Sequence, residues 1–160
     1  MATKSEITAG IQNIERHFDR LLPAIVANLD KPLPEGSWTV HDALCHIAAD
    51  ANAFARWQRL VDAHASGISA RPLGFNLDEH NEQGIAARKG KPVDDVVSEI
   101  REALRRDAAA VQAVDETLLQ RDLPNFRGEL GPGSDRLKFM TVTHNQIHLE
   151  DIEKAVTDRR

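Results

Sequence analysis

The chain has few of the residues that disulfides and β-sheets need. It contains one cysteine and no tyrosine, and aromatic residues make up 4% of its 160 residues. A single cysteine cannot form an internal disulfide, which fits a reducing compartment, so we expect a cytoplasmic protein. Strands draw on β-branched and aromatic side chains, so the composition favours an all-α fold.

Long apolar runs are also missing. The apolar stretch from Leu21 to Val26 contains Pro23 and is far shorter than the roughly 20 residues of a membrane-spanning helix. The opening residues, from Met1 to Glu6, have no apolar signal-peptide core. We therefore expect no membrane partner.

Positive charge is in the minority. Lys and Arg total 20 against 25 for Asp and Glu, which gives a formal net charge of −5. A nucleic-acid binder needs a basic face to displace counterions from phosphates, so we expect no nucleic-acid partner. A hydrophobic content of 41% is enough for a packed core, and we expect residues 1–160 to form one domain.

Apolar residues recur at helical spacing in four long segments. The predicted helices are about Ser5–Asn28, Thr39–His64, Pro92–Leu118 and a last helix that starts at Ser134 or Gly133 and ends near Val156. Residues Ala70–Gly90 are predicted to be irregular, with a short helix near Leu77–Arg88, and the Gly- and Pro-rich residues 122–133 are predicted to be a loop. The pattern indicates a four-helix bundle with a long connection between helices two and three.

Local signals mark two of the helix starts. Ser5 is a plausible N-cap of the first helix, and Thr39 with Asp42 resembles a capping box at the start of the second. Pro23 lies inside the first helix, where we expect it to cause a kink.

The residues with chemical potential lie on the last helix. Its expected inward stripe consists of Leu137, Met140, Thr141, Ile147, Ile152 and Ala155. At about 100° per residue, His144 falls near the centre of this stripe, and His148 and Asp151 lie on it too. Histidines at positions i and i+4 project the same way and can share one metal ion, although two ligands alone make a poor site. Buried histidines bonded to protein groups are the alternative interpretation.

The second helix offers a third histidine. His46 lies on the flank of the apolar stripe, and Asp50 follows one turn later. The neighbouring Cys45 diverges from His46 by about 100°, so we interpret it as a packing residue. His17, His64 and His80 show no partner pattern and are predicted to be solvated.

Two motifs carry a family resemblance. Gly36-Ser-Trp-Thr-Val-His-Asp-Ala-Leu-Cys-His-Ile-Ala resembles the signature at the start of helix two in the DinB/YfiT-like superfamily, and Thr143-His-Asn-Gln-Ile-His-Leu-Glu-Asp-Ile resembles its final-helix motif. The resemblance implies a metal held by His46, His144 and His148. The superfamily includes mycothiol-dependent maleylpyruvate isomerases, bacillithiol and mycothiol S-transferases, and metal-dependent hydrolases. The isomerase branch has Glu at the position of His144, so the chain looks closer to the three-histidine DinB type.

Three neutral imidazoles suit a divalent ion such as Zn²⁺ or Ni²⁺ and leave positions open for a small-molecule substrate. The expected chemistry is hydrolysis, or S-transfer from a low-molecular-weight thiol such as mycothiol or bacillithiol.

Asp50 and Asp151 are candidates for ligand orientation or general-base work. Trp38 is expected to pack at the start of helix two. Asn81, Arg56 and Arg88 are candidates to bind a substrate carboxylate, although ordinary surface roles are the simpler interpretation.

Two other classes of function fit the same residues. One is a non-catalytic bundle that binds a small ligand, and the other is a structural homodimer in which the histidines make polar contacts. We expect self-association, because bundles of this size often pair through exposed apolar faces.

Overall fold

The structure, a computed structural model, describes residues 1–69 and 74–157. The elements in chain order are α1 Lys4–Ala27, α2 Val40–Ala49, α3 Ala53–Ala65, α4 Leu77–Lys89, α5 Val93–Ala113, α6 Glu116–Gln120, β1 Asp122–Pro124, β2 Leu130–Pro132, α7 Gly133–Lys138, the π-helical turn η1 Phe139–Thr143, and α8 His144–Thr157. Among these described residues, no helix is long and apolar enough to cross a membrane.

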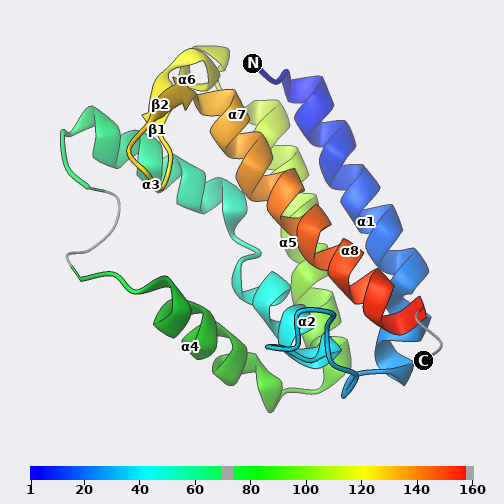
Figure 1. The fold of residues 1–160 in the computed structure, drawn as a ribbon. Helices are drawn as coiled ribbons and strands as arrows, with labels where there is room; N and C mark the ends of the chain where they lie inside the picture. The colour runs from blue at the N-terminus through cyan, green and yellow to red at the C-terminus, as the bar shows by residue number, and fades with distance from the viewer. Residues whose placement is uncertain (70–73, 158–160) are drawn as a thin grey trace.

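The architecture is a four-helix bundle, as predicted. Figure 1 shows α1, α5 and the rod formed by α7, η1 and α8 running alongside one another, and α2 and α3 supply the fourth side in two pieces. The buried face of α1 repeats at helical spacing and consists of Ile7, Ile11, Ile14, Phe18, Leu21 and Ile25. These side chains pack against the inner faces of the other helices in one hydrophobic core.

The second predicted helix is wrong in one respect, because it is broken between Asp50 and Asn52. Asp50 ends α2, and Asn52 precedes α3 without a capping hydrogen bond from its own side chain. The buried carboxylate of Asp107, on α5, acts at this point instead, since the backbone N–H groups of Phe54 and Ala53 favour its charged form. The apolar spacing continues through the break, and the partner that stabilises it lies more than 50 residues away, so helical periodicity alone could not reveal it.

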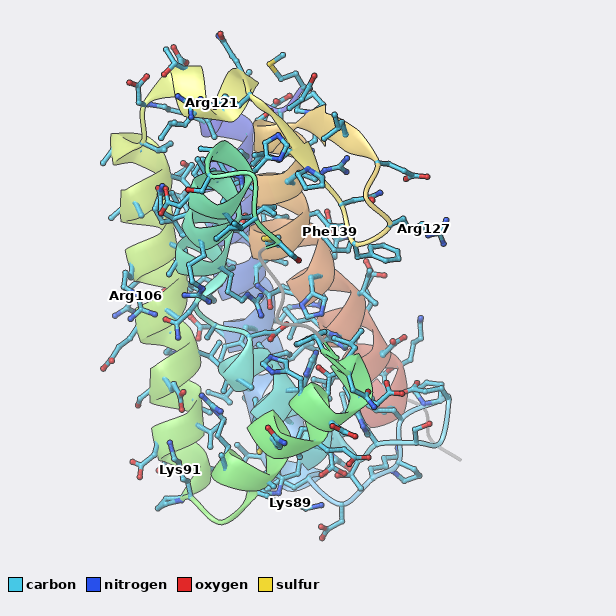
Figure 2. All side chains as sticks on the ribbon, turned by 90° about the vertical axis from the view of Figure 1, so that its left-hand side faces the viewer. Lys89, Lys91, Arg106, Arg121, Arg127 and Phe139 are labelled. Atoms are coloured by element: carbon cyan, nitrogen blue, oxygen red, sulfur yellow. The ribbon has the colours of Figure 1, made fainter. Side chains whose placement is uncertain are left out.

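The long connection contains α4, close to the predicted Leu77–Arg88. Figure 1 shows α4 outside the bundle, alongside α2. Gly84 permits this approach, since a Cβ there would lie 2.8 Å from that of Ala49. An ion pair of 2.7 Å joins Lys89 to Asp42 at the end of the bundle where Figure 2 labels Lys89. Residues 70–73, part of the segment predicted to be irregular, lie outside the described residues.

Three further boundaries differ from prediction. The N-cap of α1 is Thr3, in a capping box with Glu6, and not Ser5. The third helix ends at Ala113 and not Leu118, because Asp115 caps the separate short helix α6. The predicted loop 122–133 contains a small antiparallel hairpin of β1 and β2, whose connecting residues include Gly128 at φ +83°. The capping box of Thr39 with Asp42 is confirmed.

The π-helical turn η1 changes which face of the last helix is buried. A π turn contains one more residue than an α turn, which advances the following residues by about 100°. The buried positions of α8 are therefore Asn145, Leu149, Ile152 and Ala155. The predicted stripe is wrong at Ile147, which is 47% exposed. His144 and His148 consequently lie at the edge of the core and not at the centre of its stripe.

Candidate metal centre

Three histidines from two distant segments meet beside the core. His46 of α2 lies with His144 and His148 of α8, and one ring nitrogen from each lies within 4.8 Å of the others. The two Nε2 atoms of His144 and His148 are 3.2 Å apart. Two ligands of one tetrahedral zinc ion are about 3.3 Å apart, so this pair has the spacing of a shared ion.

The cluster is buried on one side and accessible on the other. His46 is 3% exposed, whereas the side chain of His144 is 24% exposed. The ring of Trp38 lies 4.8 Å from that of His46 and 6.0 Å from that of His148. Trp38 packs at the start of the second helix as predicted, but it also forms part of the wall around the histidines.

The protonation state of the rings suits metal binding. Burial, followed by the neighbouring His148, lowers the pKa of His46 and of His144 to about 4. Burial also lowers the pKa of His148. All three imidazoles are therefore neutral near pH 7 and carry a free lone pair each.

An unpartnered nitrogen atom also fits an ion. His46 Nδ1 is buried and makes no hydrogen bond in the described part of the chain. Leaving such atoms unpaired costs about 1–3 kcal/mol each, so a cluster of this kind is expected only where something else compensates. Ligands of one tetrahedral zinc ion lie about 3.3 Å apart, so ring nitrogens up to 4.8 Å from one another would have to move together by up to about 1.5 Å to hold it.

The two acidic candidates occupy different positions. Asp50 lies behind His144, with its Oδ2 3.6 Å from His144 Nδ1, and its Oδ1 contacts Arg56. Burial alone would raise the pKa of Asp50, but the attraction of Arg56 and of the histidines leaves it below its usual value. Asp151 lies on the outer side and pairs with Lys154 at 3.0 Å. The negative charges of Asp50, Asp151 and Glu35 each act to raise the pKa of His148, but burial outweighs them.

The remaining predicted candidates lie elsewhere or have other partners. Cys45 is fully buried, and burial, followed by the charge of Asp42, raises the pKa of its thiol, as expected for a packing residue. Arg88 donates a hydrogen bond to Glu99 of α5, and this contact joins α4 to α5. Asn81 is half-buried on α4.

The prediction for the other histidines is correct at His64 and His80, which are exposed, and wrong at His17. His17 faces α8 and lies 3.0 Å from Glu153. A carboxylate 136 positions away in the chain gives no local signal, which is why the sequence did not reveal this pair.

Sequence reasoning missed the role of Arg56 as the partner of Asp50. The apolar spacing predicts one continuous helix through both residues, and on such a helix positions six apart differ by about 120° and cannot pair. Asn52, a frequent capping residue in a segment of small side chains, was the available sign that the helix restarts.

The fold and this site define the chain as a helical bundle of the DinB/YfiT-like superfamily. Residues 11–151 match the family described as the mycothiol maleylpyruvate isomerase N-terminal domain, and the chain belongs to that family. A search of curated proteins found no match.

Solved structures share the fold at low sequence identity. YfiT from Bacillus subtilis, described as "a probable metal-dependent hydrolase with an unusual four-helix bundle topology", superposes with a TM-score of 0.72 at 18% identity, covering 97% of this chain and 88% of its own. An uncharacterised protein from Clostridium difficile 630 has a TM-score of 0.70 at 12% identity, covering 96% and 95%.

A mycothiol-dependent maleylpyruvate isomerase superposes with a TM-score of 0.69 at 20% identity. The match covers 95% of this chain but 63% of the isomerase, so the chain spans less than two thirds of that protein. The activity of the whole isomerase therefore does not transfer with the fold.

Proposed function

We propose that the protein is a metal-dependent enzyme acting on a small molecule, with His46, His144 and His148 as the metal ligands. The observation that carries the proposal is the convergence of these three imidazoles at a half-open edge of the core. Zn²⁺ and Ni²⁺ are the ions best suited to neutral imidazole donors. Such an ion would supply a Lewis acid and an open coordination position.

The chain's own residues define what can approach this position. Three neutral ligands leave the full positive charge of the ion uncompensated, which favours an anionic ligand. His46 closes the core side, while the side chain of His144, which is 24% exposed, leaves access from solvent. Trp38 provides an apolar wall beside that access.

Thiol S-transfer is the first candidate reaction, since the matching family is named for a mycothiol-dependent enzyme. In a substitution the thiol sulfur bonds to an electrophilic carbon, the leaving group departs with the electron pair of the broken bond, and the thiol proton passes to it or to solvent. In an addition the π electrons move to the far atom, which takes up the proton. Mycothiol or bacillithiol would be the co-substrate. Hydrolysis of a small molecule is the second candidate, favoured by the description of the similar YfiT structure.

Elemental analysis of untagged protein tests the metal proposal, because a polyhistidine tag would itself capture ions. We expect about one divalent ion per chain, and His46→Ala, His144→Ala or His148→Ala to lose it. His64→Ala, which removes an exposed histidine of α3, is the matched control and should retain the ion. Metal-free protein that also takes up no zinc or nickel on titration would contradict the proposal.

Turnover assays then separate catalysis from the two other classes. A non-catalytic binding bundle would show a ligand-induced rise in melting temperature with no product. A structural homodimer would lose stability in His144→Ala without any metal to lose. Self-association and a cytoplasmic location remain predictions, and sedimentation velocity tests the first.

A further inference from the structure

The break between α2 and α3 places a carboxylate and a guanidinium behind one of the three histidines. Asp50 is the last residue of α2, and Arg56 lies in the first turns of α3. On an unbroken helix these side chains would diverge by about 120°, but the break lets Arg56 Nη1 reach Asp50 Oδ1. The other carboxylate oxygen, Oδ2, is then directed to His144 Nδ1 at 3.6 Å.

We propose that Asp50 and Arg56 are positioning residues for His144. Arg56 fixes the Asp50 carboxylate, and the carboxylate keeps the proton of the neutral imidazole on Nδ1, so that Nε2 is free to bind the metal. This inference rests on the proposed function, because it assigns the donor atom of one proposed ligand.

The choice between the two ring nitrogens follows from their surroundings. A neutral imidazole has one N–H and one lone pair. A lone pair on Nδ1 would face a carboxylate, which is repulsive, whereas an N–H there faces an acceptor. At 3.6 Å the contact is too long for a hydrogen bond, and an approach of about 0.5 Å would form one. Nε2 points the other way, 3.2 Å from His148 Nε2.

The same contacts argue against Asp50 as a general base. Its side chain is 13% exposed, and its two oxygens are directed to Arg56 and to His144. Orientation of the ligand is the role that remains for it.

The chain offers a matched control for Arg56. Arg106, which Figure 2 labels midway along α5, binds the same break through Ala51 O and the Asn52 side chain, without contacting Asp50. Arg106→Met therefore removes a guanidinium from the break but leaves the pair of Asp50 and Arg56 in place. Arg56→Met removes the guanidinium that holds the carboxylate, and Arg56→Lys retains its charge.

The first measurement is the tautomer of His144 in metal-free protein, read from the ¹⁵N shifts of histidine-labelled samples. We expect the Nδ1–H form to predominate in the wild type and its population to fall in Asp50→Asn and Arg56→Met. A wild type with mainly Nε2–H at His144 would overturn the inference. This readout needs no metal, so it is independent of whether the proposed function is right.

The second measurement is zinc affinity by competition with a chelator. Loss of an orienting carboxylate behind a metal-bound histidine typically weakens binding 10–100-fold, which we expect for Asp50→Asn. We expect a smaller loss for Arg56→Met, partial recovery in Arg56→Lys, and less than a 2-fold change in Arg106→Met. Equal losses in Arg56→Met and Arg106→Met, or an unchanged affinity in Asp50→Asn, would overturn the assignment. Failure of the wild type to bind zinc would count against the proposed function instead, and the tautomer measurement would still decide the inference.

Discussion

A buried carboxylate near the start of α3 should make stability sensitive to pH. Asp107 of α5 is 5% exposed. Burial raises the pKa of Asp107 to about 6 from an ordinary value of 3.8, and the backbone N–H groups of Phe54 and Ala53 offset this only in part. The substitution Asp107→Asn keeps the shape and an acceptor oxygen but removes the titration.

The direction follows from proton linkage. Between pH 4 and 6 the folded state holds more protons at Asp107 than the unfolded state, so this group's contribution to stability decreases as pH rises through that window. The rise in the pKa of Asp107 from 3.8 to about 6 corresponds to about 3 kcal/mol of unfolding free energy, at about 1.36 kcal/mol per pKa unit. The unfolding free energy of Asp107→Asn, measured relative to that of the wild type, should therefore increase by up to about 3 kcal/mol between pH 4 and pH 7.

Urea denaturation of both proteins at intervals from pH 4 to pH 7, after dialysis against a chelator, measures this difference. Titration of the three histidines affects both proteins alike and cancels in the subtraction. Glu102→Gln, an exposed change on the same helix, is the control and should track the wild type within about 0.5 kcal/mol. A constant difference between Asp107→Asn and the wild type across the pH range would refute the reasoning.

Two packing contacts give further predictions. Trp57 is fully buried and donates a hydrogen bond of 2.8 Å to Gly133 O, which joins α3 to α7. Trp57→Phe should lower the unfolding free energy by about 2–4 kcal/mol and the melting temperature by about 5–10 °C. An unchanged melting curve would contradict a stabilising role for this contact. Gly84→Ala should destabilise by about 1–3 kcal/mol despite the higher helix propensity of alanine, because the new Cβ would lie 2.8 Å from that of Ala49. Gly90→Ala, with open space around the position, is the comparison and should be tolerated in the same thermal scans.

The sequence predicted the parts of this molecule that depend on local patterns. Helical spacing of apolar residues gave the bundle, and the capping box of Thr39 with Asp42 gave the start of α2. The spacing of His144 and His148 indicated that both side chains lie on one face, since a helix places residues four apart side by side. The inclusion of His46 depended on the family resemblance, because no local pattern joins residues about a hundred positions apart.

The parts that were missed depend on contacts between distant segments. Arg106 of α5 binds the break before α3 through Ala51 O and Asn52 Oδ1, and without that break Arg56 cannot reach Asp50. The π turn at Phe139–Thr143 likewise has no signature in apolar spacing, yet it moves His144 from the centre of the core to its edge. Both deviations from regular helix lie next to the candidate site, where π turns are frequent in proteins.

X-ray absorption at the metal edge of untagged protein tests the central claim most directly. We expect three imidazole nitrogens at about 2.0–2.1 Å from one ion, with oxygen or sulfur completing the coordination. The imidazole contribution should decrease in His148→Ala. A bound ion with no imidazole in its coordination shell, or a spectrum that His148→Ala leaves unchanged, would contradict the claim that these three histidines form a metal site.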